Sequence, residues 1–110
     1  MRAEGAWAAC HAGVERALEQ LWRDAEKSRR LPLATRLALV VANAHASAAA
    51  IEIIEAMCDV VGTSIAPAHG RFGACLRDAR TLGSHAAVSG AMLEMAAQMR
   101  SGLTPDNIWI

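Results

Sequence analysis

The sequence has no tyrosine, a single phenylalanine and no net charge, and each shortage narrows what the chain can be. The 110 residues carry 11 basic and 11 acidic side chains, and no basic stripe is interleaved with aromatic residues. A nucleic-acid-binding surface is therefore not expected. Residues that favour strands never alternate with polar residues over a useful length, so a sheet is not expected either.

Cysteines and long apolar runs are also scarce. Cys10, Cys58 and Cys75 are scattered, odd in number and without metal-ligand spacing, which indicates buried reduced thiols in a cytoplasmic protein and no metal site. The longest charge-free apolar run, residues 37–51, contains 15 residues. A membrane span needs about 20 apolar residues, so we expect a buried helix here and no membrane partner.

Alanine and aliphatic residues dominate what remains, and 54% of the chain is hydrophobic. Apolar residues recur at spacings of three and four, the period of an amphipathic helix. The chain is short enough to be a single domain over residues 1–110. We predict helices over residues 4–29, 33–61, 72–86 and 89–101. Together they favour an all-α fold, an antiparallel up-down-up-down four-helix bundle.

Two predicted apolar stripes would face the centre of this bundle. The first helix should bury a stripe of six residues: Trp7, Cys10, Val14, Ala17, Leu21 and Ala25. The last helix should bury a second stripe of four: Met92, Met95, Ala96 and Met99. We interpret both stripes as core packing.

The stretch Arg77 to His85, "RDARTLGSH", concentrates charge in a chain that has little of it. At helical spacing Asp78, Thr81 and His85 share one stripe, while Arg77, Arg80 and Ser84 form another. Glu52, Glu55 and Asp59 lie near the carboxyl end of the preceding helix, where the helix dipole disfavours negative charge.

Two interpretations of this stretch remain open. In the first, Arg77 and Arg80 form structural ion pairs with Glu55 and Asp59, partly buried and strongly stabilising, and His85 is a surface or cap residue. In the second, His85 is a general base or donates a hydrogen bond to a substrate oxygen, because histidine titrates near neutrality. Either way His85 should matter little for folding.

The order of features resembles the C-terminal helical domain of the acyl-CoA dehydrogenase superfamily. A long helix ends in the turn Gly62-Thr63-Ser64, and about fifteen residues later Arg-Asp-x-Arg and a histidine follow. Within that superfamily the chain is most similar to the flavin-dependent monooxygenase branch, which uses reduced flavin supplied by a separate reductase. The resemblance covers nearly the whole chain.

The resemblance implies roles for individual residues. Gly62, Thr63 and Ser64 match the turn that approaches a neighbouring subunit's flavin, FAD or FMN. Ala86 stands at the place of the dehydrogenases' catalytic glutamate, which argues against abstraction of an α-proton from an acyl thioester. His85 matches the histidine that similar monooxygenases place beside the flavin and the substrate hydroxyl.

The family's N-terminal helical domain and β-domain, which hold most flavin contacts, are absent from the 110 residues. We therefore expect an excised domain, a truncated product or a subunit that joins a separate flavin-binding chain, inactive and without bound cofactor alone. A homodimer or homotetramer is expected. The alternative is a stand-alone helical oligomerisation or interaction module that has lost the catalytic domains.

Overall fold

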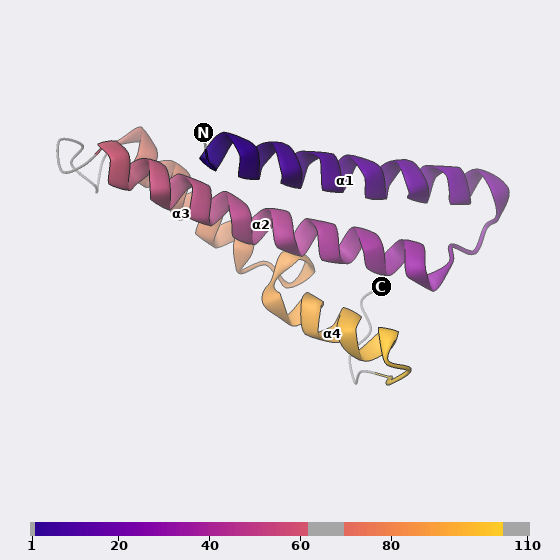
Figure 1. Ribbon diagram of the computed structural model, residues 1–110. Coiled ribbons are helices and arrows are strands. Elements are labelled where there is room, and N and C mark those ends of the chain that lie inside the picture. Colours follow the sequence, from indigo (N-terminus) through magenta and orange to yellow (C-terminus); the bar gives the residue numbers. More distant parts are fainter. Residues whose placement is uncertain (1, 62–69, 105–110) are drawn as a thin grey trace.

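The computed structural model describes residues 2–61 and 70–104, and every regular element in these two ranges is a helix. The order is α1 (Arg2–Lys27), α2 (Leu33–Val61), α3 (Arg71–Gly83), the 3-10 turn η2 (Ala86–Val88) and α4 (Gly90–Arg100) (Figure 1). The predicted all-α class is therefore confirmed for the described residues.

The helices are arranged around α2. Helix α1 runs antiparallel along one side of α2, and α3 and α4 follow one another back along the other side (Figure 1). Each of these elements packs mainly on α2. The described helices thus differ from the predicted up-down-up-down bundle, in which the first and fourth helices would also be neighbours.

Helix length explains this difference. At 1.5 Å per residue α2 is about 43 Å long, whereas α3 and α4 are only about 20 and 16 Å long. The two short helices therefore lie end to end along α2 instead of side by side. The radius of gyration is 16.7 Å, against about 13 Å for a compact domain of this length. The molecule is consequently extended.

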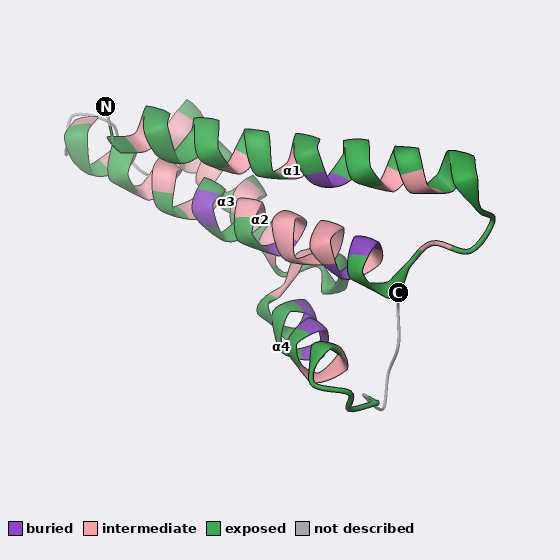
Figure 2. Cartoon of the chain, turned by 45° about the vertical axis from the view of Figure 1, so that its right-hand side comes forward, coloured by how far each residue is buried: buried purple, intermediate pink, exposed green. Residues whose placement is uncertain are grey.

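The core is a narrow seam on the two sides of α2 (Figure 2). Its buried apolar residues are Ala17 from α1, Leu37, Ala44 and Ala49 from α2, and Met92, Met95 and Ala96 from α4. The predicted methionine stripe of the last helix is therefore confirmed, with Met99 half-buried. Most of these side chains are small, so the helices bury little area for their length.

The predicted apolar stripe of the first helix is only partly correct. Ala17 is buried, and Val14 and Leu21 are half-buried beside it. Trp7, however, is 60% exposed, and Ala25 is exposed as well. Both residues lie at the edge of the stripe, where the helix surface turns away from α2.

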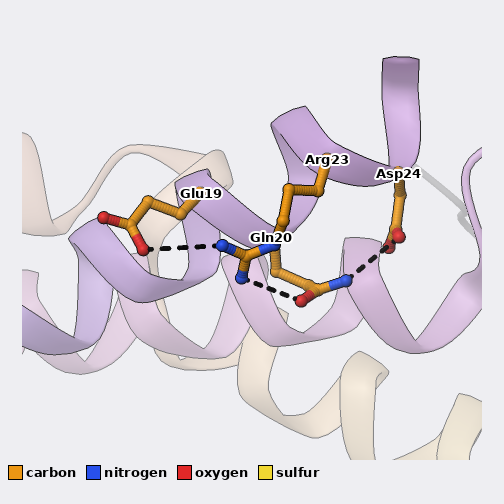
Figure 3. A network of polar contacts seen from close by, with 4 residues as sticks. All are labelled: Glu19, Gln20, Arg23 and Asp24. Atoms are coloured by element: carbon orange, nitrogen blue, oxygen red, sulfur yellow. Dashed lines mark hydrogen bonds and ion pairs between the residues drawn. The ribbon is translucent and has the colours of Figure 1, made fainter. Parts of the chain in front are cut away.

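Helix α1 ends at Lys27, two residues before the predicted end, and Asp24 in its last turn connects it to α2. The Thr35 hydroxyl donates to one Asp24 carboxylate oxygen at 2.5 Å, and the Gln20 amide donates to the other at 3.0 Å. These two hydrogen bonds, that from Thr35 foremost, hold the pKa of Asp24 below its usual value. Arg23 donates to Gln20 at 3.0 Å and lies 3.8 Å from Glu19, which extends the network along α1 (Figure 3).

Helix α2 has the predicted bounds but is less buried than the sequence suggested. Most of its residues are half-buried, and only 17% of its most apolar segment is buried. Its length and hydropathy would suit a membrane span, a property that core helices of soluble proteins share. The predicted buried helix is thus half-exposed, because α1, α3 and α4 cover two of its sides and leave two open.

The predicted third helix is shorter at its carboxyl end, which is Gly83 instead of residue 86. The Ser84 hydroxyl donates to the Arg80 carbonyl at 2.9 Å, and His85 then adopts an extended backbone. Ser89, the first residue of the predicted last helix, instead precedes α4, and its hydroxyl donates to the Ala86 carbonyl and makes no cap. This turn separates α3 from α4.

Candidate functional site

Helix α3 approaches α2 closely at Gly83, just before the candidate catalytic histidine. A Cβ atom added at Gly83 would lie 2.9 Å from Ile51 Cδ1 and 3.4 Å from Ser47 Oγ. Such a distance to Ile51 is shorter than real Cβ contacts, so a glycine is what lets the two helices meet here. The position of Ser84 and His85, the next two residues, depends on this approach.

The Ser47 hydroxyl at this approach is buried and has no hydrogen-bond partner among the described residues. An unsatisfied buried hydroxyl costs free energy, about 1–3 kcal/mol. The close packing of Gly83 against Ile51 and Ser47 therefore leaves one buried polar group, the Ser47 hydroxyl, without a hydrogen bond. The packing of Gly83 fixes the end of α3 against the middle of α2.

An ion pair links α2 and α3 one turn before Gly83. Arg80 donates to the Glu55 carboxylate at 2.5 Å, and the side chains are 61% and 44% exposed. The sequence interpretation expected a partly buried arginine held by two carboxylates. The structure instead places this pair largely in solvent, because the charged side of α3 faces away from the seam. Its expected contribution falls from that of a buried pair to about 0–1 kcal/mol.

The other residues assigned to ion pairs are also on the surface. Asp59 is exposed on the last turn of α2, and Arg77 is exposed one turn before Arg80 on α3. The predicted turn of Gly62, Thr63 and Ser64 lies outside the described residues.

His85 forms the cap of the 3-10 turn η2. Its ring Nδ1 accepts a hydrogen bond from the Ala87 backbone N–H at 3.2 Å, and the side chain is exposed. A neutral imidazole that accepts at Nδ1 carries its proton at Nε2. In that arrangement Nε2 is the hydrogen-bond donor of the exposed ring.

This geometry separates the two chemical roles predicted for His85. Among the described residues no carboxylate lies within ion-pair distance of His85, so it has no acidic partner of the kind that orients a histidine base. The neutral ring can donate from Nε2 but holds no free nitrogen to accept a proton. The arrangement thus suits a donor to a substrate oxygen better than a general base.

Two contacts were missed by sequence reasoning. The Thr35–Asp24 hydrogen bond could have been suspected from a threonine at the start of an otherwise apolar helix, facing the acidic end of the preceding one. The Ala87–His85 cap has no such signal, because histidine is not a favoured cap residue. Within the described residues no three His, Cys, Asp or Glu side chains are grouped to hold a metal ion.

Comparison with known proteins identifies the domain. The family model of the acyl-CoA dehydrogenase C-terminal domain matches residues 1–90, which include α1, α2, α3 and η2 with Arg77, Arg80 and His85. No curated protein and no solved structure matches the chain. The family model spans most of the sequence, and every regular element of the described residues is a helix. The chain therefore belongs to the family of acyl-CoA dehydrogenase C-terminal domains.

Proposed function

We propose that the chain is the C-terminal helical domain of a flavin-dependent oxidoreductase of the monooxygenase type, working in the cytoplasm. It contributes to oligomerisation and to the flavin and substrate site, and it is inactive alone. The observation that carries the proposal is the exposed His85 side chain, whose Nδ1 accepts a hydrogen bond from the Ala87 backbone N–H. The neighbouring Ala86 occupies the place of the dehydrogenases' glutamate and offers no base.

The cofactor in this proposal is a flavin, FAD or FMN, bound mainly by domains that other chains or segments supply. When bound, the flavin supplies the oxidising chemistry. The described residues offer it one fitting group, the exposed His85 donor. The turn of Gly62, Thr63 and Ser64 would be the second contact. His85 Nε2 donates a hydrogen bond to a substrate oxygen and so orients the substrate.

A closed helical bundle belongs to the same proposal. The described helices pack around α2 and leave two of its sides open. We expect the bundle to be completed in a homodimer or homotetramer, or against a separate chain that carries the flavin-binding domains. Association would then bring His85 to the edge of a site built by more than one polypeptide.

The test of inactivity is a titration of the isolated chain with oxidised and reduced FAD and FMN, followed by flavin fluorescence. No saturation is expected at micromolar concentrations. Binding in that range, together with oxidation of a substrate by this chain alone, would contradict the proposal.

The role of His85 is tested in an assembly that contains the missing domains. His85→Asn keeps a cap acceptor but removes the imidazole, whereas Ala9→Ser changes an exposed residue on the distant α1. Hydroxylation should fall with His85→Asn and stay unchanged with Ala9→Ser. Equal activity of both variants would remove His85 from the site.

A second function, a stand-alone interaction module, is supported by exposed large apolar side chains on α1, Trp7, Leu18 and Trp22. Such side chains on a small domain mark contact surfaces. The genes that flank the coding sequence distinguish the two functions. An adjacent reading frame for flavin-binding domains supports the oxidoreductase, and its absence supports the module.

A further inference from the structure

Gly83 stands at a place where helix α3 does not need a glycine for its backbone. It is the last residue of α3, and among the described residues only Gly102 has a positive φ. The residue just past a helix is the one that often needs glycine for a left-handed conformation, and here that residue is Ser84 with a φ of −82°. Within a helix, glycine is less favourable than alanine. Backbone conformation therefore does not explain Gly83.

The space around Gly83 does explain it. A Cβ atom added there would lie 2.9 Å from Ile51 Cδ1 and 3.4 Å from Ser47 Oγ, both on α2. Gly13 on α1 shows the opposite case, because among the described residues no atom beyond its own stretch of helix backbone lies within 4 Å of the Cβ that it lacks. The absent side chain at position 83 is therefore what allows α3 to meet α2.

Two unfavourable features coincide at this contact. Gly83 lowers the helix propensity of α3, and the buried Ser47 hydroxyl has no hydrogen-bond partner among the described residues. Alanine at position 83 would raise the helix propensity, and alanine at position 47 would remove the unsatisfied hydroxyl. Natural proteins break such local rules mainly at functional sites. The contact therefore points to a neighbouring group whose position matters.

His85 is that neighbouring group, and it is joined to the residues on both of its sides. Its backbone N–H donates to the Leu82 carbonyl at 2.9 Å, and its carbonyl accepts from the Val88 N–H at 3.0 Å. The ring is held as well, since Nδ1 accepts from the Ala87 N–H at 3.2 Å. The turn η2 also packs on α2, and Val88 in this turn is half-buried. The imidazole is thus fixed to α2 through Gly83 on one side and through η2 on the other.

We propose that Gly83 is a positioning residue for His85. Its missing side chain lets α3 and the turn η2 lie directly against α2, and this contact sets how far the His85 imidazole stands from the α2 axis. A larger side chain at position 83 would push the turn outward and move His85 with it. The inference rests on the proposed function, in which His85 donates to a substrate oxygen, because such a donor must be held within about 0.5 Å of its productive position.

The test exchanges volume across the contact between the two helices. Gly83→Val adds a side chain to α3, and Ile51→Ala removes the same number of carbon atoms from the residue that faces it, so the double variant keeps the total volume. Gly83→Ala adds only a methyl group against the flexible end of Ile51, and it provides a folded variant with a smaller displacement should Gly83→Val fail to fold. Gly13→Val is the matched control, since it makes the same change within a helix but in open space.

The first measurement is NMR of the whole isotope-labelled chain, with circular dichroism to check that each variant is helical. The His85 imidazole and Ala87 amide resonances should shift in Gly83→Val, shift less in Gly83→Ala and stay in place in Gly13→Val. Ile51→Ala in the double variant should return them toward wild type, because a displacement caused by the contact is reversed from α2. Resonances that do not move in the folded variants overturn the inference. A shift that persists in the double variant is a local effect of residue 83 and overturns it as well.

The second measurement is hydroxylation by an assembly that contains the missing domains. A misplacement of about 1 Å lowers a rate by about 100-fold, so kcat/KM should fall by that order in Gly83→Val and recover at least about tenfold in the double variant. If His85→Asn leaves hydroxylation unchanged while Gly83→Val shifts the His85 resonances, the proposed function fails and the coupling of Gly83 to His85 stands. If His85→Asn lowers hydroxylation and Gly83→Val does not, the positioning inference fails and the proposed function stands.

Discussion

At the residue scale, the residues that matter most are those that fix the geometry of the end of α3 and of the turn after it. Gly83 lets α3 touch α2, and His85 holds the turn that follows. The Arg80–Glu55 pair is more conspicuous in the sequence but is largely exposed. Exposed pairs are screened by water and ions, so a visible contact is not evidence of a large contribution.

The cap made by His85 leads to the first prediction. His85→Ala removes the acceptor for the Ala87 N–H and should lower the free energy of unfolding by about 0.5–1 kcal/mol, the lower range for lost caps. His85→Asn offers an amide oxygen in its place and should recover most of that loss. Urea unfolding followed by circular dichroism measures both variants. Equal loss in the two variants would show that the cap contributes nothing to stability.

The exposed ion pair leads to the second prediction. Arg80→Ala should lower the free energy of unfolding by less than about 1 kcal/mol, because both partners are in contact with solvent. Glu55→Gln serves as the control, since it removes the charge from the other partner and should have a similarly small effect. A loss of several kcal/mol in thermal or urea unfolding would instead indicate a buried pair.

At the scale of elements, α1 and α2 are joined near the short connection that contains Pro32. Thr35 is buried at the start of α2 and donates to Asp24 in the last turn of α1. This contact ties the two longest helices at one end of their shared seam. Small residues such as Ala17 and Ala49 form the rest of the seam, so its position along the helix axes is poorly specified without the tie.

The third prediction concerns the dependence of this tie on pH. The pKa of Asp24 is lower in the folded chain, so the stabilisation it gives is complete above the ordinary pKa of an aspartate and is lost as pH falls through the lowered value. Thr35→Val keeps the shape of the side chain and removes the main cause of the shift. In urea unfolding at acidic pH, wild type should lose more stability than Thr35→Val. Parallel pH profiles would exclude Asp24 as the source.

At the scale of the whole molecule, the described helices form an extended arrangement that leaves large apolar side chains uncovered. Its helices pack around α2 in an extended arrangement with a radius of gyration of 16.7 Å. Large apolar side chains on three helices remain exposed. A chain that is 54% hydrophobic therefore leaves more apolar surface in contact with water than a compact domain of the same length would.

The fourth prediction follows from this shortage of buried surface. A protein stabilised by association unfolds at a temperature that depends on its concentration. The Tm of wild type should rise by several degrees over about a hundredfold increase in concentration. The Tm of Leu18→Arg should be lower and should vary less. Differential scanning calorimetry at several concentrations measures both, and a constant wild-type Tm would argue that the monomer is stable by itself.

Much of the local structure was predictable from the sequence. The helical periodicity predicted the bounds of α2 and the methionine stripe of α4. The family was recognisable from the order of the Gly62 turn, Arg77-Asp78-x-Arg80 and His85, and the family model confirms it at the level of the domain. These features depend on residues close together in the chain, so local pattern is sufficient to find them.

The sequence by itself thus determined that the chain is helical and which residue types its turns carry. Only the tertiary structure decided which side of each helix is covered, because that depends on how many neighbours a helix has. The exposure of Trp7, the solvent position of Arg80 and the Nε2–H donor of His85 all follow from such contacts. The periodicity of α1 marks an apolar side, but it does not show whether the partner on that side is α2 or a surface outside the described helices.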